Sequence, residues 1–461
     1  MQKTVLLFTL ALFLSSCILH GPDSPFAGFW EGPHPDNPDK KFYVHIAPGD
    51  SLSVTGYWTE HGFYSSSFEI DSLDIQHENI RFYVPSWNCT YFGKLDGMVI
   101  SGGFDCPGET FDSVRLIKND SISPFLTEAI PGCWDRNFGY TYEMPVNLND
   151  GLQVAAPQMQ AERQFIDRLL PEIIHGDYGR INSFLLLKNN RLICEEYFYG
   201  YERNTLHQAE SSTKSITSLL IGITVDKGYI SDLNESVAVL LKAPDFDKRI
   251  TLEHLLTMTS GLTPNDEELI NGKDRIKTVL SRELNNTPGT VFQYDGGNTE
   301  LLGAVIKNKT GLFADVFARK YLFEPLQIKN YNWEFGKQNG YPCMAGSLLI
   351  TPREMAKIGL LVLNKGVFSG QRLVSENWIE RSTRFKTHTN IPGDDYAYQW
   401  WNLTLESEGE DFPCIWANGF GSQFIYIFPT LDVVIVTTGH NYEFDSWAIT
   451  SGIDKYLFLL N

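Results

Sequence analysis

Apolar and polar residues alternate with a period of two in the N-terminal part of the chain. The clearest example is the run of Ile80, Phe82 and Val84, which share one parity. This period is typical of strands that bury one face. The dipeptide Asp96-Gly97 between two such runs predicts a tight hairpin. Residues 27–118 are therefore expected to form a small all-β accessory domain, either a barrel or a sandwich.

From about residue 161 the pattern changes to helices that alternate with strands. Phe165, Leu169 and Leu170 have the spacing of an amphipathic helix, and Asn189-Asn190 joins two apolar runs as a hairpin would. Residues 423–428 and 431–438 read as strands, and residues 445–460 read as a closing helix. Strands at both ends with helices between them predict an α+β domain over 161–461, an antiparallel sheet flanked by helices with a helical lobe. Residues 119–160 are rich in Pro, Gly and Asn and are expected to be a linker.

The first residues predict export. Lys3 precedes an apolar run from Val5 to Leu14 that is too short to span a bilayer, and Ser15-Ser16-Cys17 follows. The end of this segment resembles a bacterial lipobox, so residues 1–17 are expected to be a lipoprotein signal peptide. Cys17 would then be lipidated and would anchor the protein to a membrane of the cell envelope, periplasmic or outer-membrane. The alternative is a plain signal peptide with an incidental cysteine.

Composition narrows the classes of partner. The chain has 461 residues and a net charge of −19, which argues against binding nucleic acid through a basic face. Export would expose the other cysteines to oxidation, and Cys89 and Cys106 lie in one β-rich segment where a disulfide would join a hairpin. The remaining pairings stay open. Neither CxxC nor HExxH occurs, so no metal or cofactor is expected, and the sequence leaves the oligomeric state open.

The stretch with the most chemical information is residues 209–223, which read AESSTKSITSLLIGI. Ser211 and Lys214 are three residues apart, so a helix would place both side chains on one face. A serine hydroxyl is a weak nucleophile until a base accepts its proton, and a lysine amine can be that base. The N-terminus of a helix also favours a developing oxyanion. The alternative is a polar helix start, with a serine cap and Lys214 in solvent.

Four further segments, together with the Ser-x-x-Lys stretch, resemble the serine β-lactamases and penicillin-binding-protein-like hydrolases. These segments are 250–262, expected to be an amphipathic helix, 288–303, 351–366 and 416–439. The most similar branch is that of class C β-lactamase-related esterases and amide hydrolases, and the resemblance covers about residues 161–461.

The resemblance implies roles for particular residues. Ser211 would be the acylated serine, Lys214 its partner, and Tyr294 the tyrosine of the second motif, with Lys214 and Tyr294 acting as general base and acid. The N–H groups of Ser211 and Phe420 would form the oxyanion hole. The third-motif strand, which contributes to substrate binding, corresponds to Ala417, Asn418 and Gly419.

Two departures from the family pattern bear on the substrate. The second motif reads Tyr294-Asp295-Gly296, without the usual Asn or Ser at its third place, and the nearest amide is Asn298. The third motif begins with Ala417, where many relatives carry a Lys or His that helps to hold a substrate carboxylate. Both losses weaken the recognition of an acidic substrate.

The hypothesis from sequence is an exported serine hydrolase that cleaves small carboxylic esters or amides through a Ser211 acyl-enzyme. One alternative is a β-lactamase, a D-alanyl-D-alanine carboxypeptidase or another penicillin-binding protein, which the missing cation at Ala417 disfavours. A second alternative is a non-catalytic binding protein on the same fold. Four further aromatic residues are candidates for either the pocket or the core: Tyr398, Trp400, Trp401 and Trp416.

Overall fold

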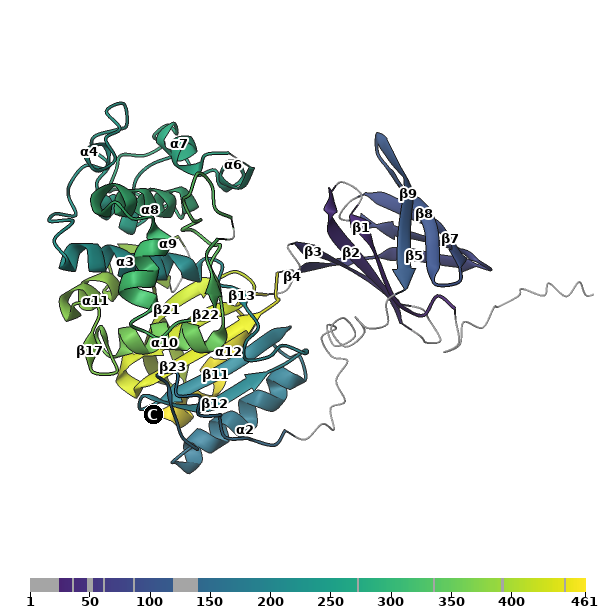
Figure 1. Ribbon diagram of the computed structural model, residues 1–461. Coiled ribbons are helices and arrows are strands. Elements are labelled where there is room, and N and C mark those ends of the chain that lie inside the picture. Colours follow the sequence, from purple (N-terminus) through teal and green to yellow (C-terminus); the bar gives the residue numbers. More distant parts are fainter. Residues whose placement is uncertain are drawn as a thin grey trace, which may run out of the picture. The chain divides into compact units, whose positions relative to one another are not determined.

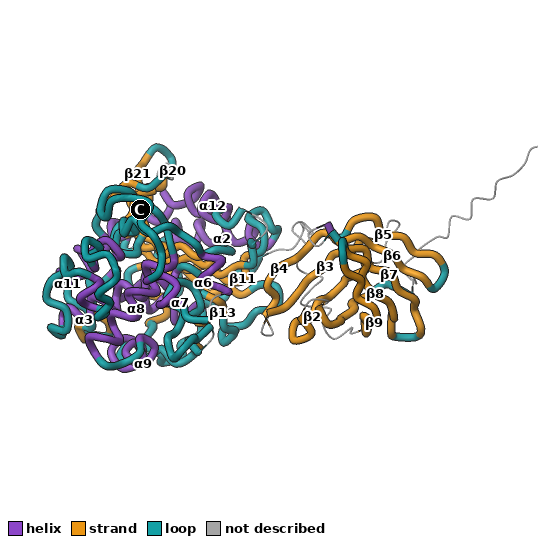
Figure 2. The backbone as a smooth tube through the Cα atoms, turned by 90° about the horizontal axis from the view of Figure 1, so that it is seen from above, coloured by secondary structure: helices purple, strands orange, loops and turns teal. Residues whose placement is uncertain are grey.

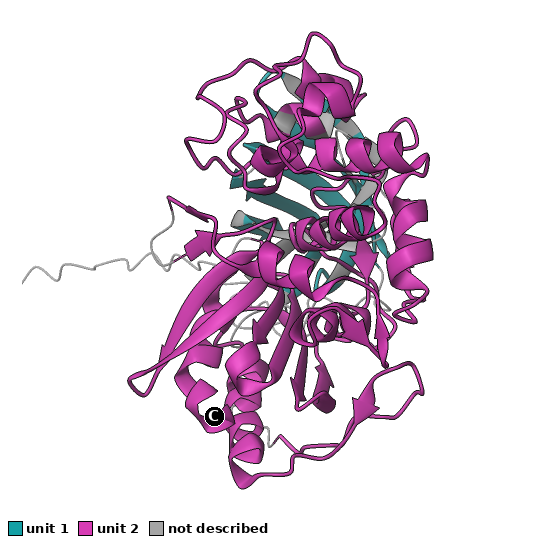
Figure 3. Cartoon of the chain, turned by 90° about the vertical axis from the view of Figure 1, so that its left-hand side faces the viewer, with its two compact units in different colours: residues 1–127 teal, residues 128–461 magenta. Residues whose placement is uncertain are grey.

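The computed structural model describes residues 25–461 except 35–36, 48–52, 61–62, 86–87, 119–139, 272, 335, 391–393 and 443–444. Cys17 and the rest of the predicted signal peptide lie outside the described residues, and so does Cys133. The chain divides into two compact units, residues 1–127 and 128–461, which have separate colours in Figure 3. Among the described residues, every helix is too short or too polar to span a bilayer.

The first unit is an antiparallel sheet with the strand order β4-β3-β2-β1-β9-β8-β7-β6-β5. The strands are β1 (Gly28–His34), β2 (Asn37–Ala47), β3 (Ser53–Glu60), β4 (Phe63–Glu69), β5 (Asp71–Gln76), β6 (Asn79–Val84), β7 (Cys89–Asp96), β8 (Val99–Cys106) and β9 (Glu109–Lys118). Only Ile70 separates β4 at one edge from β5 at the other. Because one residue joins the two edges, the sheet is rolled like a barrel (Figure 2).

The predicted alternation of this unit is confirmed. Ile80, Phe82 and Val84 are buried in β6, whereas Arg81 between them is exposed. Tyr91 stacks on Phe82 inside the sheet, with 4.9 Å between ring centroids. The Asp96-Gly97 hairpin joins β7 to β8, and a disulfide joins Cys89 to Cys106 across the open end of this hairpin.

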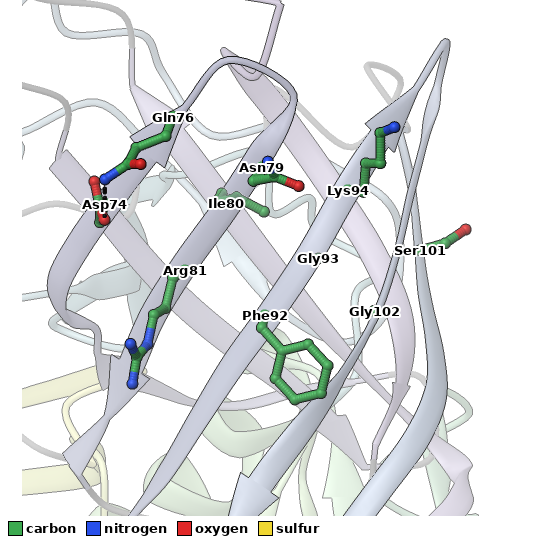
Figure 4. A pocket seen from close by; sticks show the side chains of 10 residues that line it. All are labelled: Asp74, Gln76, Asn79, Ile80, Arg81, Phe92, Gly93, Lys94, Ser101 and Gly102. Atoms are coloured by element: carbon green, nitrogen blue, oxygen red, sulfur yellow. Dashed lines mark hydrogen bonds between the residues drawn. The ribbon is translucent and has the colours of Figure 1, made fainter.

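The outer face of β5 to β8 carries a hollow of about 390 Å³ (Figure 4). Phe92 is 42% exposed there, and its ring lies over Gly103, which has no side chain to compete for the space. The Gln76 amide donates a hydrogen bond to Asp74 at 3.1 Å. The residues around the hollow are Asp74, Gln76, Asn79, Ile80, Arg81, Phe92, Gly93, Lys94, Ser101 and Gly102.

The second unit contains a mostly antiparallel sheet with the order β10-β12-β11-β23-β22-β21-β20-β19-β18. The strands are β10 (Gln153–Val154), β11 (Ile181–Lys188), β12 (Arg191–Tyr197), β18 (Thr387–His388), β19 (Asp394–Tyr396), β20 (Trp401–Ser407), β21 (Glu410–Gly419), β22 (Gln423–Phe428) and β23 (Val433–Gly439). Only the short pair of β10 and β12 is parallel. The predicted hairpin at Asn189-Asn190 is confirmed as the connection of β11 to β12.

Helices cover both faces of this sheet, which confirms the predicted α+β architecture (Figure 1). On one face lie α2 (Gln160–Ile174) and α12 (Ala448–Tyr456), which share a core with Phe184 and Leu186 of β11. On the other face lie α3 (Ser212–Asp226) and α10 (Pro352–Leu363), and α8 (Gly296–Thr310) packs on α3; all three helices share a core with Leu185 and Leu187. Burial of both faces explains the apolar run from Phe184 to Leu187 in β11, a strand that is buried along its whole length.

Shorter elements complete the unit, and several form a helical lobe above the sheet in the view of Figure 1. The helices are α4 (Val237–Leu240), α5 (Leu252–Leu256), α6 (Asp266–Asn271), α7 (Arg275–Leu280), α9 (Ala314–Ala318), a π-helical turn (Arg319–Phe323) and α11 (Glu376–Thr383). Small sheets pair β13 (His207–Gln208) and β14 (Tyr331–Asn332) with β15 (Leu349–Ile350), and β16 (Val367–Phe368) with β17 (Gln371–Arg372).

Three boundaries differ from the sequence expectation. The helix expected over 250–262 ends at Leu256, because Met258 adopts a left-handed conformation with φ 58° and the N–H of Thr259 closes the turn on the His254 carbonyl. The closing helix begins at Ala448 and becomes a 3-10 helix from Leu457. Residues 140–159, within the expected linker, pack on the second unit, and Leu152 among them is buried.

Candidate active site

Ser211 and Lys214 meet at the start of α3. Ser211 is the residue immediately before the helix, and the Lys214 amine donates a hydrogen bond to its Oγ at 2.8 Å. The same amine donates to the Ala345 carbonyl at 2.7 Å, and Lys214 is only 4% exposed. The lysine is therefore held against the serine and away from bulk solvent, unlike a surface residue of a polar helix start.

A buried ion pair fixes the carbonyl that holds Lys214. Glu300 on α8 accepts the N–H groups of Met344 and Ala345 at 3.0 and 3.1 Å. The Arg275 guanidinium pairs with the same carboxylate at 3.2 Å, and both side chains are almost fully buried. Because Glu300 orients the peptide groups at Ala345, it also orients the acceptor for the lysine amine.

Tyr294 lies in the loop that leads into α8. Asp295 begins this helix, because its Oδ1 accepts the N–H of Gly297 at 3.0 Å and the Arg282 guanidinium at 2.9 Å. The Lys214 amine lies 5.0 Å from the centroid of the Tyr294 ring. Within the described part of the chain the Tyr294 hydroxyl makes no hydrogen bond to Ser211 or Lys214. Asp295, the second residue of this motif, therefore caps the helix α8. Tyr294 contacts the Lys214 amine through the face of its ring.

Gly419 allows the end of β21 to approach the start of α3. A Cβ at this position would lie 2.5 Å from the carbonyl oxygen of Ala209, so only glycine fits there. Phe420 follows at once and brings its N–H to the same region. Neither the N–H of Ser211 nor that of Phe420 donates to another described residue. Two backbone donors are thus free beside the serine.

Glu210 is a further ionisable residue of the site, which sequence reasoning missed. It precedes Ser211 with a left-handed φ of 48°, and its carboxylate accepts the Tyr442 hydroxyl at 3.4 Å. Burial raises the pKa of Glu210 to about 7, against the opposing effects of the Lys214 charge and the Tyr442 hydrogen bond. Tyr442 also packs edge-on against Phe420, with 5.3 Å between centroids. Glu210 and Tyr442 therefore link the segment of Ser211 to the segment of Phe420, which carry the two free N–H groups.

A cavity of about 420 Å³ opens at Ser211. Its wall contains Tyr294, Asn418 and Phe420 from the predicted set. The other residues around it are Phe292, Asn390, Trp401, Asp445, Ser446 and Trp447. Of these, only Trp401 was a candidate from sequence: Phe292 lies two residues before the second motif but was assigned no role, and the other residues come from segments with no motif around them.

Several candidates from sequence lie elsewhere. Ala417 is fully buried in the core beside α3, and Asn298 is 1% exposed with its amide against the Met258 sulfur at 3.6 Å. Neither Ala417 nor Asn298 lines the cavity. Gly419 does not line it either, and its contribution is to let β21 pass close to the Ala209 carbonyl. All four aromatic candidates, Tyr398, Trp400, Trp401 and Trp416, belong to the core, and of these only Trp401 also lines the cavity.

Comparison with known proteins agrees with this geometry. The family model described as Beta-lactamase matches residues 182–442. The 6-aminohexanoate-dimer hydrolase of Paenarthrobacter ureafaciens is 24% identical over 285 residues, which cover 55% of this chain and 71% of that protein. Protein flp of Staphylococcus aureus strain MW2 is 28% identical over 203 residues, 39% of each chain. A putative 6-aminohexanoate-dimer hydrolase structure from Bacillus anthracis aligns with a TM-score of 0.54 at 20% identity, over 61% of this chain and 79% of that one.

Proposed function

This chain belongs to the beta-lactamase family and is a serine hydrolase, and from that premise we propose that it cleaves carboxylic esters or amides through an acyl-enzyme on Ser211. The observation that carries the proposal is the contact of 2.8 Å between the Lys214 amine and the Ser211 hydroxyl, at the mouth of a cavity. A base in contact with a serine is the arrangement that makes the hydroxyl nucleophilic.

Acylation is the first half of the reaction. Lys214 accepts the proton of Ser211 while Oγ attacks the substrate carbonyl carbon, and a carbon–oxygen bond forms. The free N–H groups of Ser211 and Phe420 stabilise the resulting oxyanion, where one such donor contributes about 3 kcal/mol. The tetrahedral intermediate then collapses, the bond to the leaving group breaks, and the leaving group takes a proton from Lys214 or through Tyr294.

Deacylation uses water and returns the enzyme to its starting state. A water molecule gives a proton to the basic network and attacks the acyl carbon, and the ester bond to Ser211 breaks. Oγ regains its proton, and a carboxylic acid leaves the cavity. The aromatic walls at Phe292, Tyr294 and Trp401 suit a substrate with apolar parts.

Hydrolysis of β-lactams or of D-alanyl-D-alanine peptides is the less favoured alternative. Such substrates present a carboxylate, and Ala417, where relatives carry a cation, is buried in the core without a charge. The name of the Paenarthrobacter relative, 6-aminohexanoate-dimer hydrolase, supports a small-molecule substrate for this chain as well.

Steady-state kinetics test this proposal. p-Nitrophenyl acetate, p-nitroacetanilide and nitrocefin are offered to the wild type and to Ser211→Ala. We expect turnover of the ester or the anilide, and a loss in kcat on the order of 10³-fold or more in the variant. Equal turnover by the variant would remove Ser211 from the mechanism. Efficient turnover of nitrocefin alone would favour the β-lactamase alternative.

We also propose that the protein is an exported lipoprotein anchored through Cys17, on the strength of the lipobox-like segment. Growth of an expressing bacterium with radiolabelled palmitate tests this, with Cys17→Ser as the matched variant. The wild type should take up label and the variant should not. Label in both proteins, or in neither, would contradict the anchor.

A further inference from the structure

Half of the ten described residues around the catalytic cavity are aromatic. Trp401 packs against Phe292 and Tyr294, with 6.2 and 5.4 Å between ring centroids. Phe420 and Trp447 come from other segments and remain 54% and 50% exposed. Exposed rings inside a cavity are open to a ligand, and the face of an aromatic ring attracts a cation.

Negative charge predominates at the same cavity. Asp445 is the only charged residue among the described residues that line it. The nearby amine of Lys214 is no competing site for a ligand, because Lys214 is 4% exposed and already bonded to Ser211 and Ala345. The chain as a whole has a net charge of −19, so its field favours the approach of a cation and opposes that of an anion.

The orientation of the Asp445 carboxylate leaves room for a ligand. Oδ1 accepts the backbone N–H of Trp447 at 2.9 Å, which fixes the side chain beside that indole. Oδ2 has no partner within the described part of the chain. The Trp447 indole is itself tied to the Asn418 amide oxygen at 3.4 Å, so the carboxylate and the ring are held together at the cavity.

We propose that the substrate of this site carries an ammonium group, primary or quaternary, which Asp445 and the Trp447 ring recognise. This inference rests on the proposed function, since it names the substrate class of the same cavity. It goes beyond the loss of the family cation at Ala417, because that loss only removes a preference for anions, whereas a carboxylate beside an exposed indole creates a preference for cations.

Charge isosteres provide a sharp test. Butyrate esters of choline and of 3,3-dimethylbutanol have the same shape and differ by one positive charge on the alcohol part. A second pair of p-nitrophenyl esters carries a trimethylammonium or a tert-butyl group at the end of the acyl chain. We expect kcat/KM to favour the cationic member of at least one pair by about tenfold at low salt. A matching ester with a terminal carboxylate should be the poorest substrate.

Two variants locate the preference. Asp445→Asn keeps the oxygen that accepts the Trp447 N–H but removes the charge, and Trp447→Leu removes the ring. In both variants the cation-to-neutral ratio of kcat/KM should fall towards one. A ratio of one or less in the wild type for both pairs would overturn the inference, and so would a ratio that stays unchanged in Asp445→Asn. Ser211-dependent turnover of the neutral esters would still leave the proposed function standing, whereas no Ser211-dependent turnover of any ester would overturn both.

Discussion

At the scale of single residues, the site depends on side chains that hold one another in place. Lys214 touches Ser211, the Ala345 carbonyl holds Lys214, and Glu300 holds the peptide groups at Ala345. The spacing of Ser211 and Lys214 predicted that a helix would place both on one face, but it left open whether Lys214 points into solvent, and only the further family-like segments favoured a contact. Glu210 and Tyr442 were not predictable, since their partnership spans 232 residues and depends on the fold.

Glu210 should leave a signature in the pH dependence of stability. An unfolded Glu210 ionises near its ordinary pKa of 4.5, and the folded one near 7. Between these values the folded state binds more protons, so the free energy of unfolding falls as the pH rises. In Glu210→Gln this loss is absent, because the amide keeps the polar contact without ionising.

Urea unfolding of both proteins from about pH 5 to about pH 8 measures this effect. The difference in unfolding free energy between variant and wild type should grow in favour of the variant across that range. Other groups that titrate in the range are common to both proteins and cancel in the difference. A difference that is constant with pH would contradict the raised pKa of Glu210.

At the scale of elements, close backbone approaches set the geometry. The strand β21 comes near the start of α3 at Gly419, and α10 packs on the sheet at Gly359, where a Cβ would lie 2.5 Å from Val434. Sequence patterns predicted α3 and the hairpin of β11 and β12, because these follow from local periodicity and turn residues. The early end of α5 was not predictable, because the left-handed turn at Met258 involves a residue that rarely adopts it.

Gly419→Ala should damage catalysis more than stability. The new methyl group would meet the Ala209 carbonyl and push β21 away from α3, which separates the N–H of Phe420 from that of Ser211. A misplacement near 1 Å at a catalytic group costs about 10²-fold in rate. Steady-state kinetics and the thermal transition of the variant should show a large fall in kcat with most of the fold retained.

Gly359→Ala is the matched control. Its methyl group meets Val434 and Ile425 in the core, and Gly359 does not line the cavity. Overpacking at stiff, branched side chains costs about 1–3 kcal/mol, and two contacts under 3.0 Å place this site in the upper part of that range, above the gain of about 1 kcal/mol in helix propensity. The control should therefore lose stability and keep kcat. Equal kcat values in the two variants would contradict the role given to Gly419.

At the scale of the whole molecule, chemistry and fold are divided between two units. Every described residue that lines the catalytic cavity belongs to residues 128–461, and the disulfide belongs to residues 1–127. The all-β character of the first unit was predictable from its alternation. The full composition of the cavity was not, because Asp445 and Trp447 follow β23 and reach Ser211 only through the tertiary fold.

Loss of the disulfide should act on the first unit alone. The bond between Cys89 and Cys106 closes a loop with a separation of 17 residues, and such a link contributes about 3 kcal/mol. In the double variant Cys89→Ser/Cys106→Ser, the unfolding transition of the first unit should move to lower denaturant. The kcat of the folded double variant should remain that of the wild type. A fall in kcat would contradict the conclusion that catalysis resides in the second unit alone.

The central claim is that Ser211 is an activated nucleophile, and covalent labelling tests it most directly. The protein from residue 24 onward is treated with a fluorophosphonate, and its intact mass is measured beside Ser211→Ala. We expect one phosphonyl adduct on the wild type, located at Ser211 by peptide mapping, and none on the variant. An adduct on another residue, or no adduct on the folded wild type, would contradict it.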